Sequence, residues 1–79
     1  MGKQYIRVIL YINEHGKLTP IQMKPGEHAE WVKIDKVKDC RRRASLKAGG
    51  VGMRHTCVIN HNDFYLFDEE GKWFIETDN

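Results

Sequence analysis

The sequence predicts an all-β protein, a small antiparallel barrel of five or six strands with an SH3-like architecture. Apolar and polar residues alternate along several short stretches, turn-forming residues separate these stretches, and no stretch carries the apolar stripe of a long helix. With 79 residues the chain is long enough for a single domain, residues 1–79, around one modest core. Closing the sheet into a barrel would remove its exposed edges.

The first two strands are expected at residues 5–12 and 18–23. In the first, apolar side chains at every second position share one face, and the β-branched and aromatic residues argue against a helix. Gly16 can supply the positive φ that a tight hairpin turn needs. Pro20 cannot donate a ladder hydrogen bond, so it predicts an edge position or a bulge in the second strand.

The third strand is expected at residues 31–40, with a bend or bulge near Asp35 because the apolar positions change parity there. Residues 41–52 begin with arginines and end with glycines, which predicts an irregular connection. This connection has room for a short helix over residues 42–47, closed by Gly49.

Three further strands are expected at residues 53–59, 64–67 and 73–77. Residues 60–63 are Asn, His, Asn and Asp, which favour a turn because such side chains tolerate the left-handed backbone region. Residues 68–72 are expected to join the last two strands as a hairpin loop.

The two cysteines, Cys40 and Cys57, are too few for the disulfide framework of a small secreted domain. The N-terminal residues lack the apolar core of a signal peptide, and no apolar run approaches the ~20 residues of a membrane helix. These observations predict a cytoplasmic protein with reduced thiols and no membrane partner.

Charge is strongly polarised along the chain, although the net charge is only +2. Residues 33–54 hold eight basic and two acidic residues, whereas residues 63–79 hold six acidic residues and one basic residue. A basic segment of this kind attracts nucleic-acid phosphates without reading base sequence. The residues expected to contact phosphates are Lys36, Lys38, Arg41, Arg42, Arg43, Lys47 and Arg54. The alternative is a solvated surface on which the two segments form ordinary ion pairs.

The last two strands carry aromatic residues on both faces, although the core of a small barrel needs only one face. Tyr65, Phe67 and Phe74 form the second aromatic face. If exposed, this face predicts a protein interface with a partner or with a second copy of the chain. Acidic residues surround it in the sequence and argue against stacking on nucleic-acid bases. Alternatively, the first strand or a chain terminus covers this face.

The sequence contains no recognisable catalytic constellation. Four residues could ligate zinc, but they lack the closely spaced pairs typical of zinc sites: Cys40, His55, Cys57 and His61. The glycines of residues 49–52 precede a strand rather than a helix, which does not match a nucleotide-binding loop. The sequence therefore predicts a binding protein rather than an enzyme, with no cofactor and no metal.

Several short motifs follow one another in a distinctive order. Residues 34–37 read Ile-Asp-Lys-Val, and residues 43–52 read Arg-Ala-Ser-Leu-Lys-Ala-Gly-Gly-Val-Gly. Residues 65–67 and 72–74 read Tyr-Leu-Phe and Lys-Trp-Phe. In this order they resemble a family of short, uncharacterised bacterial proteins in which a strand ending in Asp-x-Arg runs into the same loop. The resemblance covers most of the chain, and it implies no activity or catalytic residue for this sequence.

Overall fold

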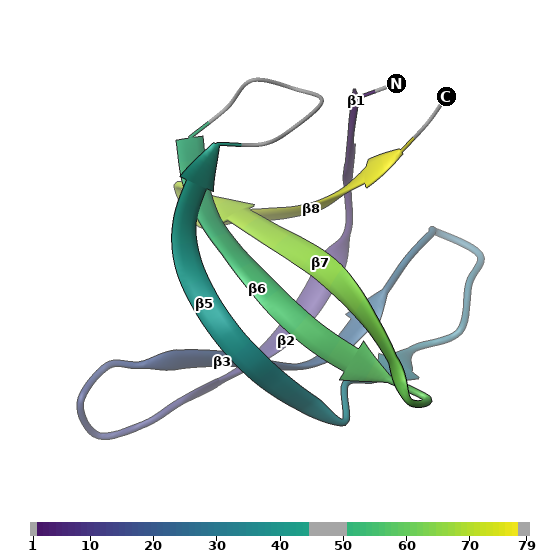
Figure 1. Ribbon diagram of the computed structural model, residues 1–79. Coiled ribbons are helices and arrows are strands. Elements are labelled where there is room, and N and C mark those ends of the chain that lie inside the picture. The colour runs from purple at the N-terminus through teal and green to yellow at the C-terminus, as the bar shows by residue number, and fades with distance from the viewer. Residues whose placement is uncertain (1, 45–50, 78–79) are drawn as a thin grey trace.

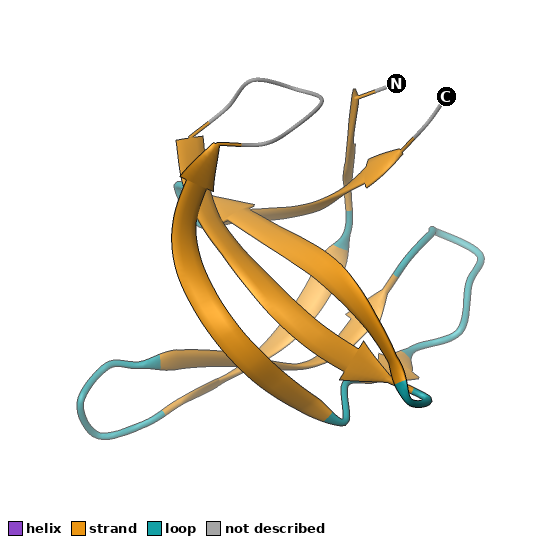
Figure 2. Cartoon of the chain, viewed as in Figure 1, coloured by secondary structure: helices purple, strands orange, loops and turns teal. Residues whose placement is uncertain are grey.

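The computed structural model describes residues 2–44 and 51–77, and in this part of the chain every regular element is a strand (Figure 2). Five strands form one antiparallel sheet in the order β1–β8–β7–β6–β5, and three form a second in the order β2–β3–β4 (Figure 1). The larger sheet consists of β1 (Gly2–Tyr5), β8 (Lys72–Thr77), β7 (Asn62–Glu69), β6 (Val51–Ile59) and β5 (Lys36–Ala44). The smaller sheet consists of β2 (Arg7–Ile12), β3 (Leu18–Lys24) and β4 (Val32–Lys33). The prediction of an all-β protein is confirmed.

The predicted first strand passes from one sheet to the other at Ile6. Tyr5, the last residue of β1, pairs with Phe74 of β8, whereas Arg7, the first residue of β2, pairs with β3. The backbone N–H of Ile6 donates to the carbonyl of Trp73 at 3.0 Å. One nearly continuous segment therefore belongs to both sheets and holds them against each other.

The core lies between the two sheets. Met23 and Ile34 contribute to it from the side of the smaller sheet, and Cys57, Leu66 and Trp73 contribute from the larger sheet. Alternate residues of β2 add partly buried apolar side chains, as the sequence pattern predicts. Burying an aliphatic or aromatic side chain of this size stabilises a domain by about 1.5–3 kcal/mol, so this layer is the main source of stability.

Tight turns join neighbouring strands where the sequence tolerates positive φ. Gly16 has a φ of 82° in the turn between β2 and β3. Asn60 (50°) and His61 (69°) connect β6 to β7, and Glu70 (54°) and Gly71 (81°) connect β7 to β8. Two successive residues with positive φ are typical of the type I′ turn, whose twist matches that of paired strands. The turn predicted at Gly16 is confirmed, and the turn predicted at residues 60–63 is shorter in the structure because residues 62–63 belong to β7.

The predicted third strand is divided between the sheets. β4 ends at Lys33 and β5 begins at Lys36, so the bend predicted near Asp35 is a break between two strands. Residues 42–44 continue β5, so the short helix does not begin there, and residues 45–49 lie outside the described residues. β5 is an edge strand of its sheet, where a run of charged side chains stays solvated and discourages pairing with other chains.

A bulge interrupts the pairing of β2 and β3. The register shifts so that Ile9 pairs with Gln22 and the next residue, Leu10, pairs with Pro20. The bulge predicted in this strand is therefore confirmed. β3 lies between β2 and β4, but β4 pairs only with Gln22 and Met23, so Pro20 needs no ladder hydrogen bond on that side.

The described strands do not close into a barrel. Two backbone hydrogen bonds lie near the break between β4 and β5. The N–H of Ile34 donates to the carbonyl of Ile21 at 3.0 Å, and the N–H of Asp35 donates to the carbonyl of Val58 at 2.8 Å. Beyond this point β3 and β5 form no ladder, and β3 crosses behind β5 at a wide angle (Figure 1). The open side of the molecule therefore lies between these two strands. None of the described residues belongs to a helix that is long and apolar enough to cross a membrane.

Candidate nucleic-acid interface

The basic segment and an exposed aromatic side chain meet on the outer face of the larger sheet, the face turned away from the core. The register of β5, β6 and β7 pairs Arg41 with Arg54 and pairs Thr56 with Tyr65. Because successive side chains of a strand point to opposite faces, Arg54 and Thr56 point away from the side of the buried Cys57. We refer to the following residues of this face as the outer-face site: Lys36, Lys38, Arg41, Arg54 and Tyr65.

Arg54 and Tyr65 are in direct contact. The guanidinium carbon of Arg54 lies 4.3 Å from the centroid of the Tyr65 ring, which is a cation–π contact. Tyr65 keeps 45% of its surface exposed. Arg54 Nε is buried and has no hydrogen-bond partner, and none of the ion pairs between described side chains includes Arg54. The charge of this guanidinium is therefore not committed to a carboxylate of the described chain.

Two other cations of the site have acidic neighbours. Lys38 Nζ donates to Asp63 Oδ2 at 2.9 Å, and this hydrogen bond, together with the charge of Asp63, raises the pKa of Lys38. Arg41 Nε lies 3.4 Å from Asp39 Oδ2, while Asp39 Oδ1 accepts a hydrogen bond from Thr56 at 3.1 Å. Exposed ion pairs of this kind contribute little to stability, because water and salt screen the charges. A phosphate can therefore compete with either carboxylate at a small cost.

The structure brings only part of the predicted phosphate-contacting set together. The residues that lie on the outer face are Lys36, Lys38 and Arg41, which are exposed, and Arg54, which is half-buried. Arg42 pairs with Met53 and is exposed on the other face of β5. Lys47 and the side chain of Arg43 lie outside the described residues.

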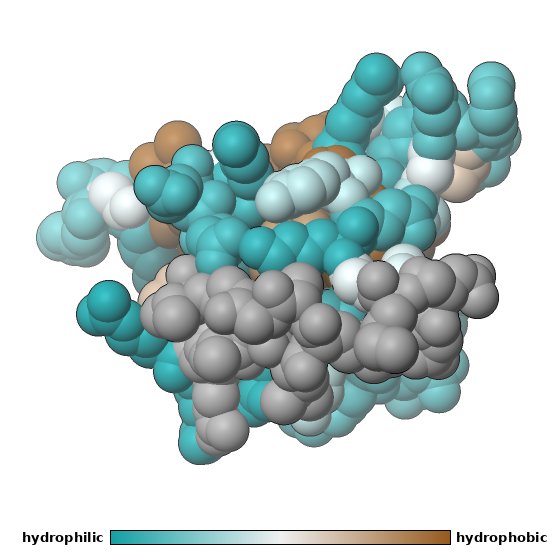
Figure 3. Space-filling view, turned by 90° about the horizontal axis from the view of Figure 1, so that it is seen from above, coloured by the Kyte–Doolittle hydropathy of each residue, from teal (hydrophilic) through white to brown (hydrophobic). Residues whose placement is uncertain are grey.

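The second aromatic face is only partly exposed. Phe67 and Phe74 are 3% and 2% exposed, and their rings stack with centroids 5.3 Å apart. Tyr5 of β1 packs edge-on against Phe74 at 5.7 Å, and the ammonium of Lys3 lies 4.8 Å from the same ring. The first strand therefore covers Phe74, and Tyr65 alone of the three predicted interface residues remains exposed. Seen from above, the visible surface is mostly hydrophilic, with hydrophobic atoms in small separate areas (Figure 3).

A groove opens on the inner side of β5 and β6, where β3 diverges from them. It has a volume of about 460 Å³, and its apolar lining comes from Leu18 and Pro20 of β3, Val37 of β5 and Met53 of β6. Cys40, His55 and Asp68 supply polar groups to the same groove.

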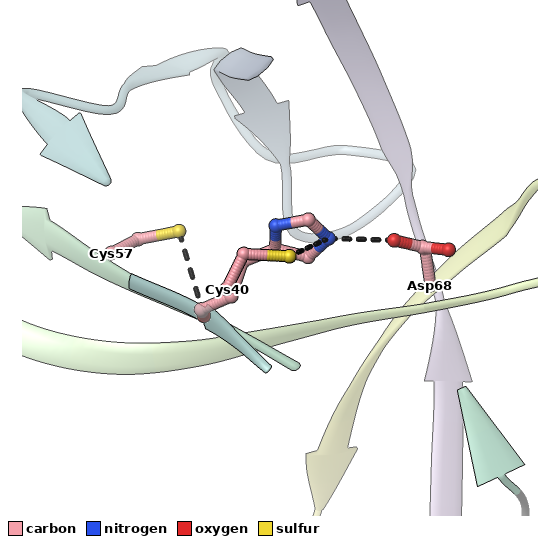
Figure 4. A network of polar contacts seen from close by, with 4 residues as sticks. Cys40, Cys57 and Asp68 are labelled. Carbon is pink, nitrogen blue, oxygen red and sulfur yellow. Dashed lines mark hydrogen bonds and ion pairs between the residues drawn. The ribbon is translucent and has the colours of Figure 1, made fainter. Parts of the chain in front are cut away.

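His55, which is buried, and Asp68, which is half-buried, form a polar pair in this groove. His55 Nε2 lies 2.6 Å from Asp68 Oδ2 and 4.0 Å from Cys40 Sγ (Figure 4). The His55 ring is 5% exposed and packs against Trp73 with centroids 4.8 Å apart. Sequence reasoning did not connect His55 with Asp68, because the two meet only through the pairing of β6 with β7.

This cluster does not match the geometry of nucleophilic catalysis. Cys40 and Asp68 approach the same ring nitrogen, whereas in a catalytic relay the nucleophile and the carboxylate contact opposite nitrogens. Burial raises the pKa of the Cys40 thiol, and the charges of Asp68 and Asp39 raise it further. Cys40 is therefore a protonated thiol near neutral pH, and the thiolate is the form that reacts.

Both cysteines are free thiols, and burial, with a smaller contribution from Cys40, raises the pKa of Cys57 to about 12. In residues 2–44 and 51–77, no group of three or more His, Cys, Asp or Glu side chains is arranged to hold a metal ion.

Comparisons of the chain with models of protein families, with curated proteins and with solved structures find no match. The resemblance to a family of short bacterial proteins stays a prediction, and the functional proposal below depends on the outer-face site.

Proposed function

We propose that the protein is a small binding module that associates with nucleic acid through the outer-face site. The observation that supports this most strongly is the contact between Arg54 and the exposed Tyr65. Arg41 of the neighbouring strand β5 lies opposite Arg54 and adds a second cation. Cations from two strands and an exposed ring therefore share one continuous face. Such a face suits the nucleic-acid backbone, because phosphate contacts fix position without reading sequence.

The strength of this association is expected to be modest. The two acidic neighbours, Asp39 and Asp63, partly neutralise the cations and compete with phosphates. The described site offers few cations, so we expect micromolar or weaker affinity that falls with salt. For a single strand, the logarithm of affinity falls with the logarithm of salt concentration by ~0.7 per phosphate contact.

We further propose that the two sheets are the halves of a partly open barrel of the SH3-like kind. The crossing at Ile6, which places one segment in both sheets, supports this assignment, as does the hydrogen bond from Ile34 to Ile21 at the opposite margin. We propose the cytoplasm as the compartment, since reduced thiols such as Cys40 and Cys57 persist there.

The salt dependence of binding tests the proposal. The triple variant Lys36→Ala, Lys38→Ala and Arg41→Ala is expected to reduce the slope against log salt by about 2 for a short labelled oligonucleotide. The matched control removes the same charge from exposed positions outside the larger sheet: Arg7→Ala, Lys17→Ala and Lys33→Ala. The control is expected to keep a slope close to that of the parent protein. Equal losses in both variants would show that net charge alone drives binding, which contradicts the proposed site.

The alternative is a protein-interaction subunit or homodimer that uses the C-terminal aromatic hairpin. It has less support, because Phe67 and Phe74 are internal and contact each other. A stable dimer in sedimentation that dissociates in Phe67→Asp without loss of the fold would favour this alternative.

A further inference from the structure

We infer that the outer-face site binds single-stranded nucleic acid in preference to duplex, with one unpaired base stacked on Tyr65. This inference rests on the proposed function and adds the class of ligand. Tyr65 is the exposed ring of the site, and two cations lie near it: Arg54 lies against the ring itself, and Lys38 reaches Asp63, two residues along β7. A ring bordered by cations can hold a base while the neighbouring phosphates meet the charges.

The structure weakens the objection that acidic residues around Tyr65 would repel phosphates, because three of these residues are turned away or paired with a cation. Asp68 points to the other face of the sheet, where its carboxylate lies 2.6 Å from His55 Nε2. Asp63 is paired with Lys38, and Glu69 is paired with Lys3 at 2.7 Å. These acidic side chains are adjacent to Tyr65 in the sequence, but each is directed away or paired with a cation.

The contact between Arg54 and Tyr65 also favours a flat ligand. Arg54 is half-buried, its Nε is enclosed and its guanidinium lies against one face of the Tyr65 ring, so a base has to stack on the opposite face. The side chain of Thr56, opposite Tyr65 in the ladder, is engaged by Asp39 and does not compete for a ligand. The ring is therefore held in place before a ligand arrives, which lowers the entropy cost of stacking.

A duplex cannot use this arrangement. Its bases are stacked on one another, so an exposed protein ring reaches a base face only if the strand is unpaired or the base is flipped out. A single strand turns its bases outward at no such cost, and every base offers a ring face, so we expect little sequence preference. Phosphate contacts through Lys36 and Arg41 serve both forms, whereas Tyr65 serves the single strand alone.

The test compares one labelled oligonucleotide, free and annealed to its complement, against variants of Tyr65. Tyr65→Leu keeps apolar bulk without an aromatic ring and is expected to weaken single-strand binding about 5- to 150-fold, the range that one stacked base supplies. Tyr65→Phe keeps the ring and is expected to bind like the parent protein. Duplex binding is expected to be weaker and equal in all three proteins. Tyr11→Leu is the matched control, because Tyr11 is 58% exposed but lies on the smaller sheet.

Two results would overturn the inference while leaving the proposed function intact: duplex binding as strong as single-strand binding, or the same affinity in Tyr65→Leu as in Tyr65→Phe. Failure of the parent protein to bind either form would overturn both the inference and the proposed function. Circular dichroism of each variant shows whether the fold is retained, and the comparison between Tyr65→Phe and Tyr65→Leu remains valid if both keep the parent spectrum.

Discussion

Replacement of Phe67 with alanine tests whether Phe67 belongs to the buried part of the aromatic face. Phe67 is 3% exposed and its ring stacks on Phe74, whereas Tyr65, two residues earlier on the same strand face, is 45% exposed. Truncating a buried phenylalanine costs about 3–5 kcal/mol, because apolar surface is lost and a cavity remains. Natural domains are stabilised by only about 0.05–0.15 kcal/mol per residue, so a chain of this length has roughly 4–12 kcal/mol in total. Phe67→Ala is therefore expected to remove a large fraction of the stability of the domain.

Tyr65→Ala is the matched control and is expected to cost roughly 1 kcal/mol, which includes the cation–π contact with Arg54 at an exposed site. Urea unfolding followed by tryptophan fluorescence measures both variants against the parent protein. If Phe67→Ala loses less than about 1 kcal/mol, or no more than Tyr65→Ala, then Phe67 is not internal. The three aromatic residues would then form an exposed patch, and the protein-interface alternative would regain its support.

Two further predictions concern a close backbone contact and a buried thiol. A Cβ on Gly52 would clash with the carbonyl oxygen of Asp68, so Gly52→Ala is expected to cost about 1–3 kcal/mol in urea unfolding. The control is Gly26→Ala, whose Cβ would meet only Ala29 at 3.8 Å and which is expected to stay within about 0.5 kcal/mol of the parent protein. Similar losses in both variants would contradict the close contact at Gly52. The pKa of Cys57 is raised from 9.0 to about 12, so its thiol stabilises the fold below the lower value and this stability is lost as pH rises toward the higher one. The free energy of unfolding should therefore fall more steeply between these pH values in the parent protein than in Cys57→Ala, and parallel curves would show that Cys57 is not desolvated.

Local patterns were sufficient to predict most strands and turns. The strand at residues 5–12 can be read from the alternation of apolar and polar residues within one segment. The positive φ of Gly16 can be read from the residue type, because glycine adopts this conformation readily. The division of that first strand at Ile6 was not predictable in this way, because it depends on the carbonyl of Trp73 from the last strand. The end of β5 was misjudged for a similar reason, since a run of arginines is compatible with an irregular connection and with a solvated edge strand.

The candidate site was predictable in composition but not in arrangement. The sequence indicated a basic segment and an aromatic hairpin as separate surfaces. The register of β5, β6 and β7 joins Arg41, Arg54 and Tyr65 on one face, and such pairings connect residues that are distant in the chain. Coverage of this face by the first strand was one of two alternatives, and the sequence did not decide between them because Lys3 and Tyr5, which contact Phe74, come from the opposite end of the chain.

Photo-crosslinking locates bound nucleic acid on the protein surface and so tests whether it lies on the outer-face site. A single-stranded oligonucleotide containing 5-bromouracil is irradiated with the parent protein, and the modified residue is identified by mass spectrometry. Four exposed aromatic side chains can react: Tyr5 (56%), Tyr11 (58%), Trp31 (42%) and Tyr65 (45%). The crosslink is expected on Tyr65, and its yield is expected to fall with added salt as binding does. A crosslink shared evenly among the four, or concentrated on Tyr11 or Trp31, would contradict binding at the outer-face site.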